Sequence, residues 1–465
     1  MKGETRRRAV VIGASMAGLS AAAVLASRFA EVVLVDRDAM GDEPGDRRGV
    51  PQGRHAHALL PGGLQRMEGW FPGYTEDLLA DGARLVDTAA DVLWHQAGGR
   101  RVRFESGILM PVASRALLEH HVRRRVLDLP NVSLRRGAAA SGLTTTSDNR
   151  TVTGITLEDG ETLPADLVVD ASGRAGRTVL WSAGLGYPEP PTSHVTIDMR
   201  YASRIFRREP SEAREWDLGL VMAPPPDGRQ GVLFPLEGDR WMVTLAGFHG
   251  DQPPKDPEGF LAFARSLPSP EVAAIIETCE PLSDIVTHRL PSNQRRHVEE
   301  LRRVPGGLVM VGDAVCSFDP VYGQGMSSAT IQAEALGQEL DRTTALDDRF
   351  VRAFYRRSAK AVTPIWQMST GADFAFPATT GPKPPGTDMI NRHMARVLVA
   401  TQVSEEICQR FLEVTCLLRP ARDLLTPAMA LKVRRALRRT TAAAAVPKPT
   451  APAAAQAAPE LERAA

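Results

Sequence analysis

The sequence has few cysteines, no long apolar run and no excess of charge of either sign. Its four cysteines form no Cys-x-x-Cys pair and have no histidine at zinc-finger spacing, which argues against a disulfide framework and a structural zinc. No stretch of about 18 apolar residues exists, so no transmembrane segment is expected. Lys+Arg is 56 against Asp+Glu 55, whereas a protein that binds nucleic acid would show a larger basic excess.

The N-terminus also lacks the apolar segment and cleavage site of a signal peptide, because a glycine-rich turn follows the first arginines directly. We therefore expect a cytoplasmic protein. Its 465 residues, 43% hydrophobic and 24% charged, are typical of a globular protein whose core needs no metal or disulfide. This length predicts two or three domains, or one large composite domain.

The first motif is a glycine-rich turn between a short buried strand and an Ala-rich helix. Residues 9–12 are apolar, Gly13 makes the tight turn, and Gly18 lets the helix pack closely on the strands. The free N–H groups at the positive end of such a helix suit a pyrophosphate. A second buried strand, 32–35, ends at Asp36, where a carboxylate accepts hydrogen bonds from a ribose hydroxyl. The alternative is an ordinary strand–helix turn that needs small residues for packing.

Two further motifs follow buried strands. Residues 166–173 read Asp-Leu-Val-Val-Asp-Ala-Ser-Gly, which alone is equally typical of a strand leaving the sheet. Strand 307–311 leads to Asp313, whose carboxylate suits a sugar hydroxyl. Gly323 and Gly325 then allow a close backbone approach to a ligand. The helix expected from about 325 to 341 points its positive end at that ligand, although a plain glycine turn before a helix would also explain the two glycines.

The remaining pattern predicts the layout around these motifs. A helix is expected over 114–129 with Ser114 as its N-cap, and Asp159-Gly160 suggests a hairpin between strands 152–157 and 167–170. Alternation within 194–246 predicts an antiparallel sheet. Residues 347–440 are mostly helical in pattern, with a Pro/Gly interruption at 377–386.

Together the three motifs resemble the flavoprotein monooxygenases of the para-hydroxybenzoate hydroxylase fold. The resemblance implies an α/β fold with a Rossmann-like FAD-binding domain of the glutathione-reductase type, an inserted antiparallel-sheet substrate domain and a C-terminal helical region. The expected divisions are the FAD-binding domain at 8–184 and 301–345, the substrate domain at 185–300, the helical region at 346–441 and a disordered Ala/Pro tail at 442–465.

A closer resemblance is to bacterial FAD epoxidases of polyether biosynthesis, the lasalocid and monensin type, and to related actinobacterial tailoring oxygenases. It rests on four stretches, which are Arg48 to His57, Ser114-Arg115-Ala-Leu-Leu, Tyr201 to Arg207, and Pro320 to Ser327. The FAD-binding residues that the resemblance implies are Gly13, Ser15, Met16, Ala17, Gly18, Asp36, Arg37, Arg48, Arg115, Asp313, Pro320, Gly323, Gly325 and Met326.

The same resemblance implies a monooxygenase that uses O2 and reduced FAD, through a flavin C4a-hydroperoxide, to epoxidise or hydroxylate an apolar natural product such as a polyketide olefin. Because the flavin carries the chemistry, no side chain is nominated as catalytic. Phe234, Pro235 and Trp241 are expected to line the substrate pocket. NAD(P)H is the expected electron donor, and whether it acts directly or through a partner flavin reductase stays open.

Other interpretations remain. An aromatic polyketide hydroxylase would share the fold, and a geranylgeranyl-reductase-like enzyme would share the Asp170 to Gly173 motif but need no oxygen. A flavin halogenase would carry a Trp-x-Trp-x-Ile-Pro segment, which the sequence lacks, and a non-enzyme would only hold FAD and ligand. Packing is favoured over metal binding for His55 and His57, and a buried small residue over a flavin link for Cys316. A solvated face is favoured over a membrane anchor for the basic segment 432–439.

Overall fold

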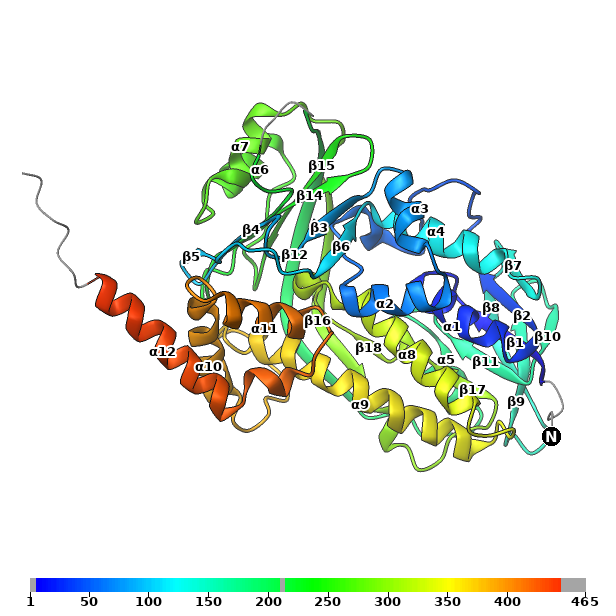
Figure 1. Ribbon diagram of the computed structural model, residues 1–465. Coiled ribbons are helices and arrows are strands. Elements are labelled where there is room, and N and C mark those ends of the chain that lie inside the picture. Colours follow the sequence, from blue (N-terminus) through cyan, green and yellow to red (C-terminus); the bar gives the residue numbers. More distant parts are fainter. Residues whose placement is uncertain (1–5, 210–213, 445–465) are drawn as a thin grey trace, which may run out of the picture.

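The computed structural model describes residues 6–209 and 214–444. A parallel sheet, a large sheet dominated by antiparallel pairs, and a group of C-terminal helices succeed one another across the molecule (Figure 1). Within the described ranges, no helix has both the length and the apolar character needed to cross a bilayer. The expected disordered tail falls outside the described residues except for 442–444, which end the last helix.

The parallel sheet has the strand order β17-β11-β1-β2-β7. Its strands are β1 (Arg6–Ile12), β2 (Phe29–Asp36), β7 (Val132–Arg136), β11 (Leu167–Asp170) and β17 (Leu308–Met310). Alternate side chains enter different cores: Val11 and Leu34 face a core shared with α1 (Met16–Ala26) and α8 (Gln324–Leu340). Val10 and Val33 face the small sheet β8 (Ala140–Thr145), β9 (Val152–Leu157) and β10 (Thr162–Pro164). Burial on both faces explains the unbroken apolar runs of these strands.

The hairpin expected between strands 152–157 and 167–170 is wrong. β9 instead pairs with β10, with Leu163 opposite Ile155. β11 enters the parallel sheet between β1 and β17. All four residues of β11 are buried, which suits a central parallel strand better than one arm of a hairpin. The three-residue β10 is too short to show in the hydrophobic pattern.

The large sheet has the order β18-β16-β12-β15-β14-β13-β4-β5. Its strands are β4 (Val92–Gln96), β5 (Gly99–Arg100), β12 (Thr192–Arg207), β13 (Leu218–Met222), β14 (Gln230–Leu236), β15 (Arg240–Gly247), β16 (Val286–Arg296) and β18 (Cys316–Ser317). The pairs are antiparallel except β4 with β13, which run parallel. Thus two strands from before residue 185 and one from after residue 300 complete it. α6 (Pro257–Arg265) and α7 (Glu271–Thr278) cover one face.

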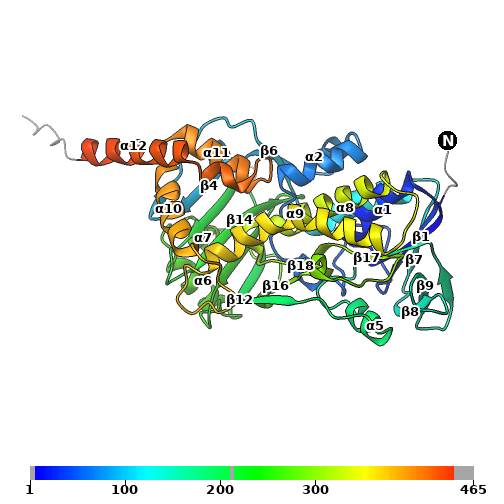
Figure 2. The ribbon, with the colours of Figure 1, turned by 90° about the horizontal axis from the view of Figure 1, so that it is seen from below.

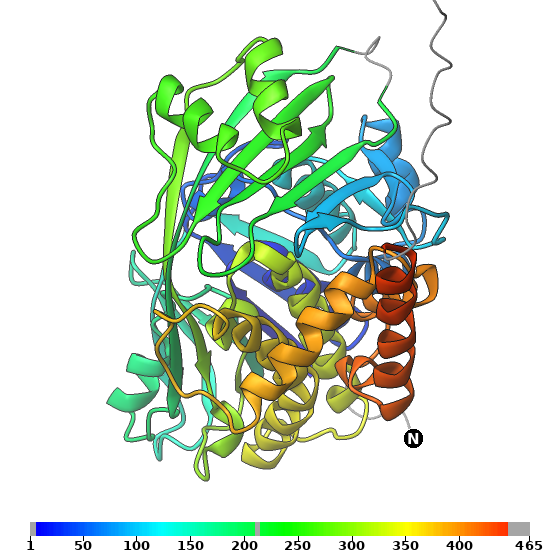
Figure 3. The same ribbon diagram turned by 90° about the vertical axis from the view of Figure 1, so that its left-hand side faces the viewer.

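The C-terminal helices are α9 (Asp348–Asp373), α10 (Thr387–Ala400), α11 (Glu405–Thr415) and α12 (Pro427–Ala444). α10, α11 and α12 lie beside the large sheet, at the end of the molecule away from the parallel sheet (Figure 1 and Figure 3). α9 instead runs along α8 toward the parallel sheet, where the Tyr355 hydroxyl accepts a hydrogen bond from Met310 N of β17 at 3.2 Å. α12 projects from this end (Figure 2). The expected Pro/Gly interruption separates α9 from α10.

Shorter elements complete the chain. They are α2 (Pro61–Trp70), α3 (Tyr74–Ala80), α4 (Arg115–Leu127), α5 (Thr178–Gly184) and the two-stranded pair β3 (Arg84–Asp87) and β6 (Leu109–Val112), with short 3-10 turns η1 (Pro51–Arg54), η2 (Val298–Glu300), η3 (Gly312–Ala314), η4 (Pro320–Tyr322) and η5 (Ala421–Leu424). Ser114 caps α4 as expected, because its hydroxyl accepts a hydrogen bond from Leu117 N at 3.1 Å.

Candidate active site

The turn between β1 and α1 is closely packed. Gly13 adopts a φ of +97°, and a Cβ added at Gly18 would lie 1.8 Å from the carbonyl oxygen of Gly13. Ser15 is the N-cap of α1, but its side chain accepts no hydrogen bond from the helix. The first turn of the helix contains no acidic residue. The positive end of α1 is therefore left without a side-chain cap, as an anion-binding turn requires.

A buried network of charged side chains surrounds this turn. Asp36 accepts hydrogen bonds from Ala14 N at 2.7 Å and from Arg47 at 2.6 Å. Arg47 also pairs with Glu119, whose other carboxylate oxygen contacts Ser15 Oγ at 2.6 Å and Arg115 at 3.0 Å. Burial would raise the pKa of Glu119, but Arg115 and Arg47 hold it below its ordinary value. The network thus favours the ionised form of Glu119 and joins α4 to the turn.

Some of the expected FAD-binding residues near the β1–α1 turn are buried and others are exposed. Met16 is buried, and Ala17 packs so closely that a Cβ at Gly312 would lie 2.6 Å from its own Cβ. Arg115 belongs to the network described above. Arg37 and Arg48 are exposed. The arginine next to Arg48, Arg47, is the one that enters the network.

The third motif lies at the carboxyl end of β17. Asp313 is half-buried and makes no hydrogen bond or ion pair with the described residues. Burial raises its pKa, against the opposing effect of Arg115 and Arg174. Gly323 precedes α8 as its N-cap with a φ of +62°, and no atom lies within 4 Å of a Cβ added at Gly325. Pro320 is exposed and Met326 is buried. The N-terminal end of α8 therefore has open space at Gly325.

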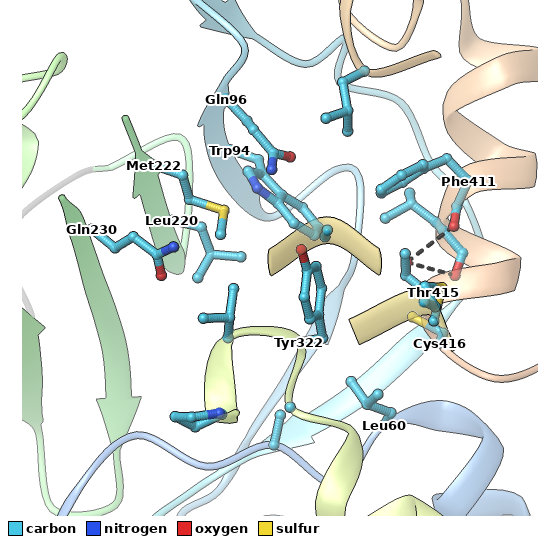
Figure 4. A pocket seen from close by; sticks show the side chains of 18 of the residues that line it. Leu60, Trp94, Gln96, Leu220, Met222, Gln230, Tyr322, Phe411, Thr415 and Cys416 are labelled. Atoms are coloured by element: carbon cyan, nitrogen blue, oxygen red, sulfur yellow. Dashed lines mark hydrogen bonds between the residues drawn. The ribbon is translucent and has the colours of Figure 1, made fainter. Parts of the chain in front are cut away.

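A cavity of about 540 Å³ lies beyond this loop. Trp94 and Leu220 of the large sheet, Tyr322 of η4, and Phe411 and Thr415 of α11 line it, as Figure 4 shows. Aliphatic, aromatic and methionine side chains dominate the wall, and no Asp, Glu or Lys of the described chain belongs to it. A cavity of this size and character suits a small apolar molecule.

Of the three residues expected in the substrate pocket, Phe234 lines this cavity, whereas Pro235 and Trp241 do not. Pro235 lies opposite Trp241 in the β14–β15 pair, whereas Phe234 lies opposite Met242. Because alternate residues of a strand point to opposite faces, Trp241 is completely buried against α6 and α7. The expectation that Pro235 and Trp241 form the pocket wall is therefore corrected.

Sequence reasoning missed several functional candidates. Two of them could have been found from the sequence: Glu119 follows Arg115 by one helical turn, and Arg47 directly precedes Arg48, which was expected to bind FAD. Tyr322 lies within the stretch Pro320 to Ser327 noted in the sequence, although it was not expected to line the pocket, whereas Trp94 and the α11 residues of the wall had no signal. Their contribution depends on packing between distant elements, which hydrophobic pattern does not specify.

The structure shows the surroundings of His55, His57 and Cys316, for which packing was weighed against metal binding or a flavin link. His55 is buried, and its Nδ1 lies 2.7 Å from Ser203 Oγ, while His57 Nδ1 lies 2.9 Å from the His55 carbonyl oxygen. No group of three or more His, Cys, Asp or Glu side chains in the described parts of the chain is arranged to hold a metal. Cys316 is buried in β18, where burial raises the pKa of its thiol well above the ordinary value.

Comparison with known proteins gives one extensive sequence match. No model of a protein family matches the chain. Protein Rv3254 of Mycobacterium tuberculosis is 33% identical over 399 residues, which are 82% of this chain and 83% of that protein. The chain belongs to the family of Rv3254. A shorter match, 28% identical over 198 residues, relates 39% of this chain to 37% of the FAD-dependent monooxygenase dmxR9 of Cryptosporiopsis.

Several solved structures share the fold of this Rv3254-family chain. PqsL, a probable FAD-dependent monooxygenase from Pseudomonas aeruginosa, matches with a TM-score of 0.59 at 17% identity over 79% of this chain and 97% of its own. The flavin-dependent brominase Bmp2 matches with a TM-score of 0.62 at 14% identity, over 94% and 99%. The oxygenase of 2-methyl-3-hydroxypyridine-5-carboxylic acid matches with 0.56 at 20%, over 79% and 91%. The expected fold class is confirmed, and the relatives named as monooxygenases agree with the expected enzyme class.

Proposed function

We propose that this protein is an FAD-dependent monooxygenase that transfers one oxygen atom from O2 to an apolar small molecule, epoxidising a polyketide-type olefin. The observation that carries the proposal is the position of one loop. Residues Pro320 to Gly323 form a wall of the apolar cavity, and the same residues lead into the N-terminus of α8 in the dinucleotide-binding fold. A cofactor bound along that fold would therefore meet a substrate in the cavity.

The unpaired polar groups at the motifs fit FAD. Arg115 Nε is buried without a hydrogen-bond partner in the described chain, and the N-terminus of α1 has no side-chain cap. These donors suit the phosphates, whose oxygens accept from arginine and from helix N-termini. Asp313 would accept from a hydroxyl of the sugar or ribityl chain. The open space at Gly325 leaves room for the flavin ring near the positive end of α8.

Bound FAD supplies the redox chemistry, because the reduced flavin activates O2 for transfer to an electron-rich carbon. The chain's own contribution is orientation and exclusion of water. Phe234 and Trp94 give apolar surface on the sheet side, and Phe411 gives it on the helix side. Among the titratable lining groups, His55 stays neutral at physiological pH because burial lowers its pKa to about 3. A wall without carboxylates favours an olefin, which needs no general base, over a phenol.

The test is a spectrum of the purified protein followed by oxygen labelling. We expect flavin absorbance that bleaches with NADPH or with a flavin reductase and returns in air. We further expect one ¹⁸O atom from ¹⁸O2 in the product of a polyene substrate. A flavin that stays reduced in air, or substrate turnover without oxygen, would replace the monooxygenase with a reductase. Bromide-dependent product would replace it with a halogenase, although no lysine of the described chain lines the cavity.

A further inference from the structure

A buried arginine lies directly behind one wall of the cavity. Arg101 is 7% exposed, and its guanidinium carbon lies 3.3 Å from the ring centroid of Trp94 and 4.4 Å from that of Phe411. Both rings line the cavity, but Arg101 itself does not. In the close-up, Trp94 lies with Gln96 at the end of the cavity opposite Leu60 (Figure 4). A positive charge thus sits behind this end of an apolar chamber.

This charge has no counter-ion among the described residues. No carboxylate pairs with Arg101, and burial lowers its pKa to about 9. The ionisable groups that act on it are the thiols of Cys408 and Cys416. Burial raises the pKa of these thiols to about 11 and about 12, so both are neutral at pH 7. A buried cation without a partner is costly, which indicates that something else neutralises it when the site is in use.

The hydrogen bonds around Arg101 leave donors without acceptors. Arg101 Nη2 donates to Gln96 Oε1 at 2.6 Å, and this bond fixes the Gln96 amide with its oxygen toward Arg101. Gln96 Nε2 makes no hydrogen bond with the described residues, and Gln96 lines the cavity. Gln96 is half-buried. Behind it, Trp94 Nε1 and the Nε and Nη1 atoms of Arg101 are buried without partners in the described chain. Buried donors in folded proteins are nearly always satisfied, so this end of the cavity lacks an acceptor.

We propose that the Trp94–Gln96 end of the cavity is a subsite for a carboxylate at the end of an apolar chain. Gln96 Nε2 donates to the carboxylate directly. Arg101 acts as a positioning residue, since it orients the Gln96 amide and supplies the positive field behind the wall. The proposal rests on the proposed function in that the same cavity holds the substrate, and it adds the class of that substrate, an unsaturated chain with an acidic end group.

The test compares two probes on the purified full chain. Calorimetric titration measures the affinity for 9-decenoate and for 9-decen-1-ol, which differ in the end group alone. We expect the unaltered protein to prefer the carboxylate by about tenfold or more, the value typical of a hydrogen bond to a charged group. Gln96→Leu and Arg101→Met should each remove most of that preference. Gln230→Leu, at a cavity glutamine on β14 that makes no hydrogen bond with Arg101, should keep it.

Equal affinities in the unaltered protein would overturn the subsite, as would a preference that survives both Gln96→Leu and Arg101→Met. Either variant alone decides the question if the other fails to fold. Because binding is measured without turnover, the two proposals fail separately. A carboxylate preference in a protein that never oxygenates the chain would keep the subsite and remove the monooxygenase. Oxygenation of the alcohol and the acid with equal KM would keep the monooxygenase and remove the carboxylate subsite.

Discussion

The buried network around the turn between β1 and α1 predicts that Arg47→Met destabilises the protein. Arg47 is 8% exposed on its side chain and contacts three carboxylates, those of Asp36, Asp38 and Glu119, which are 7%, 10% and 4% exposed. Methionine fills similar space but leaves these carboxylates without their shared cation. Removing one partner of a buried ion pair costs about 3–5 kcal/mol of unfolding free energy.

The assay is a thermal melt together with a titration of FAD into the apoprotein. For a chain of this length the unfolding entropy predicts a fall in Tm of about 3–5 °C. FAD affinity should also fall at least about tenfold, because the network fixes Ser15 and Arg115 beside the α1 turn. Arg48→Met is the matched control, since Arg48 is adjacent in sequence but exposed, and it should change Tm by less than about 1 °C.

An acid titration adds a second signature. The pKa of Glu119 is lowered in the folded protein by Arg115 and Arg47, so this group contributes stability above its unfolded pKa and loses it as pH falls through the folded value. Arg47→Met raises that folded pKa, so the stability gap between the two proteins should narrow on acidification below about pH 4.5. Equal Tm values for Arg47→Met and the unaltered protein, or equal losses for Arg47→Met and Arg48→Met, would refute the reasoning.

Three further predictions follow from single contacts. Phe234→Ala and Trp241→Ala should each cost about 3–5 kcal/mol of stability in denaturant melts, but only Phe234→Ala should raise the substrate KM, because Trp241 faces away from the cavity. Gly325→Ala should leave the apoprotein as stable as before, since its Cβ meets nothing within 4 Å, yet weaken FAD binding in a fluorescence titration. Burial lowers the pKa of His55 to about 3, so between pH 6.5 and 4 the unfolding free energy should fall by about 1.4 kcal/mol per pH unit on its account. If urea melts show that the unfolding free energy of His55→Gln depends on pH as steeply as that of the unaltered protein, this prediction is wrong.

The local parts of the fold could be predicted because they depend on neighbours in sequence. The turn after residue 12, the strand that ends at Asp36 and the Ser114 cap each follow from a few adjacent side chains. The pairing of β4 with β13 could not be predicted in this way. It joins Val92 to Leu218 across more than a hundred residues, and five residues of alternation do not specify a partner.

The cavity was predictable only in part for the same reason. The alternation within 194–246 correctly predicted an antiparallel sheet, and β14 and β15 pair within it. It did not say which face of that sheet is inward, so Phe234 and Trp241 were assigned to one wall although they face opposite cores. The wall contributed by α11 depends on how the C-terminal helices pack, which amphipathic spacing leaves undetermined.

Arg47 and Arg101 are both buried, but only Arg47 is paired with carboxylates of its own chain. Arg47 meets several carboxylates from its own chain, and those contacts join the turn between β1 and α1 to α4. Arg101 meets aromatic faces and one amide oxygen, and two of its nitrogens find no acceptor in the described chain. Since desolvation penalises both cations alike, the difference lies in what neutralises them. A charge that the chain itself pairs belongs to the fold, whereas a charge left unpaired beside a cavity marks where a molecule of opposite charge binds.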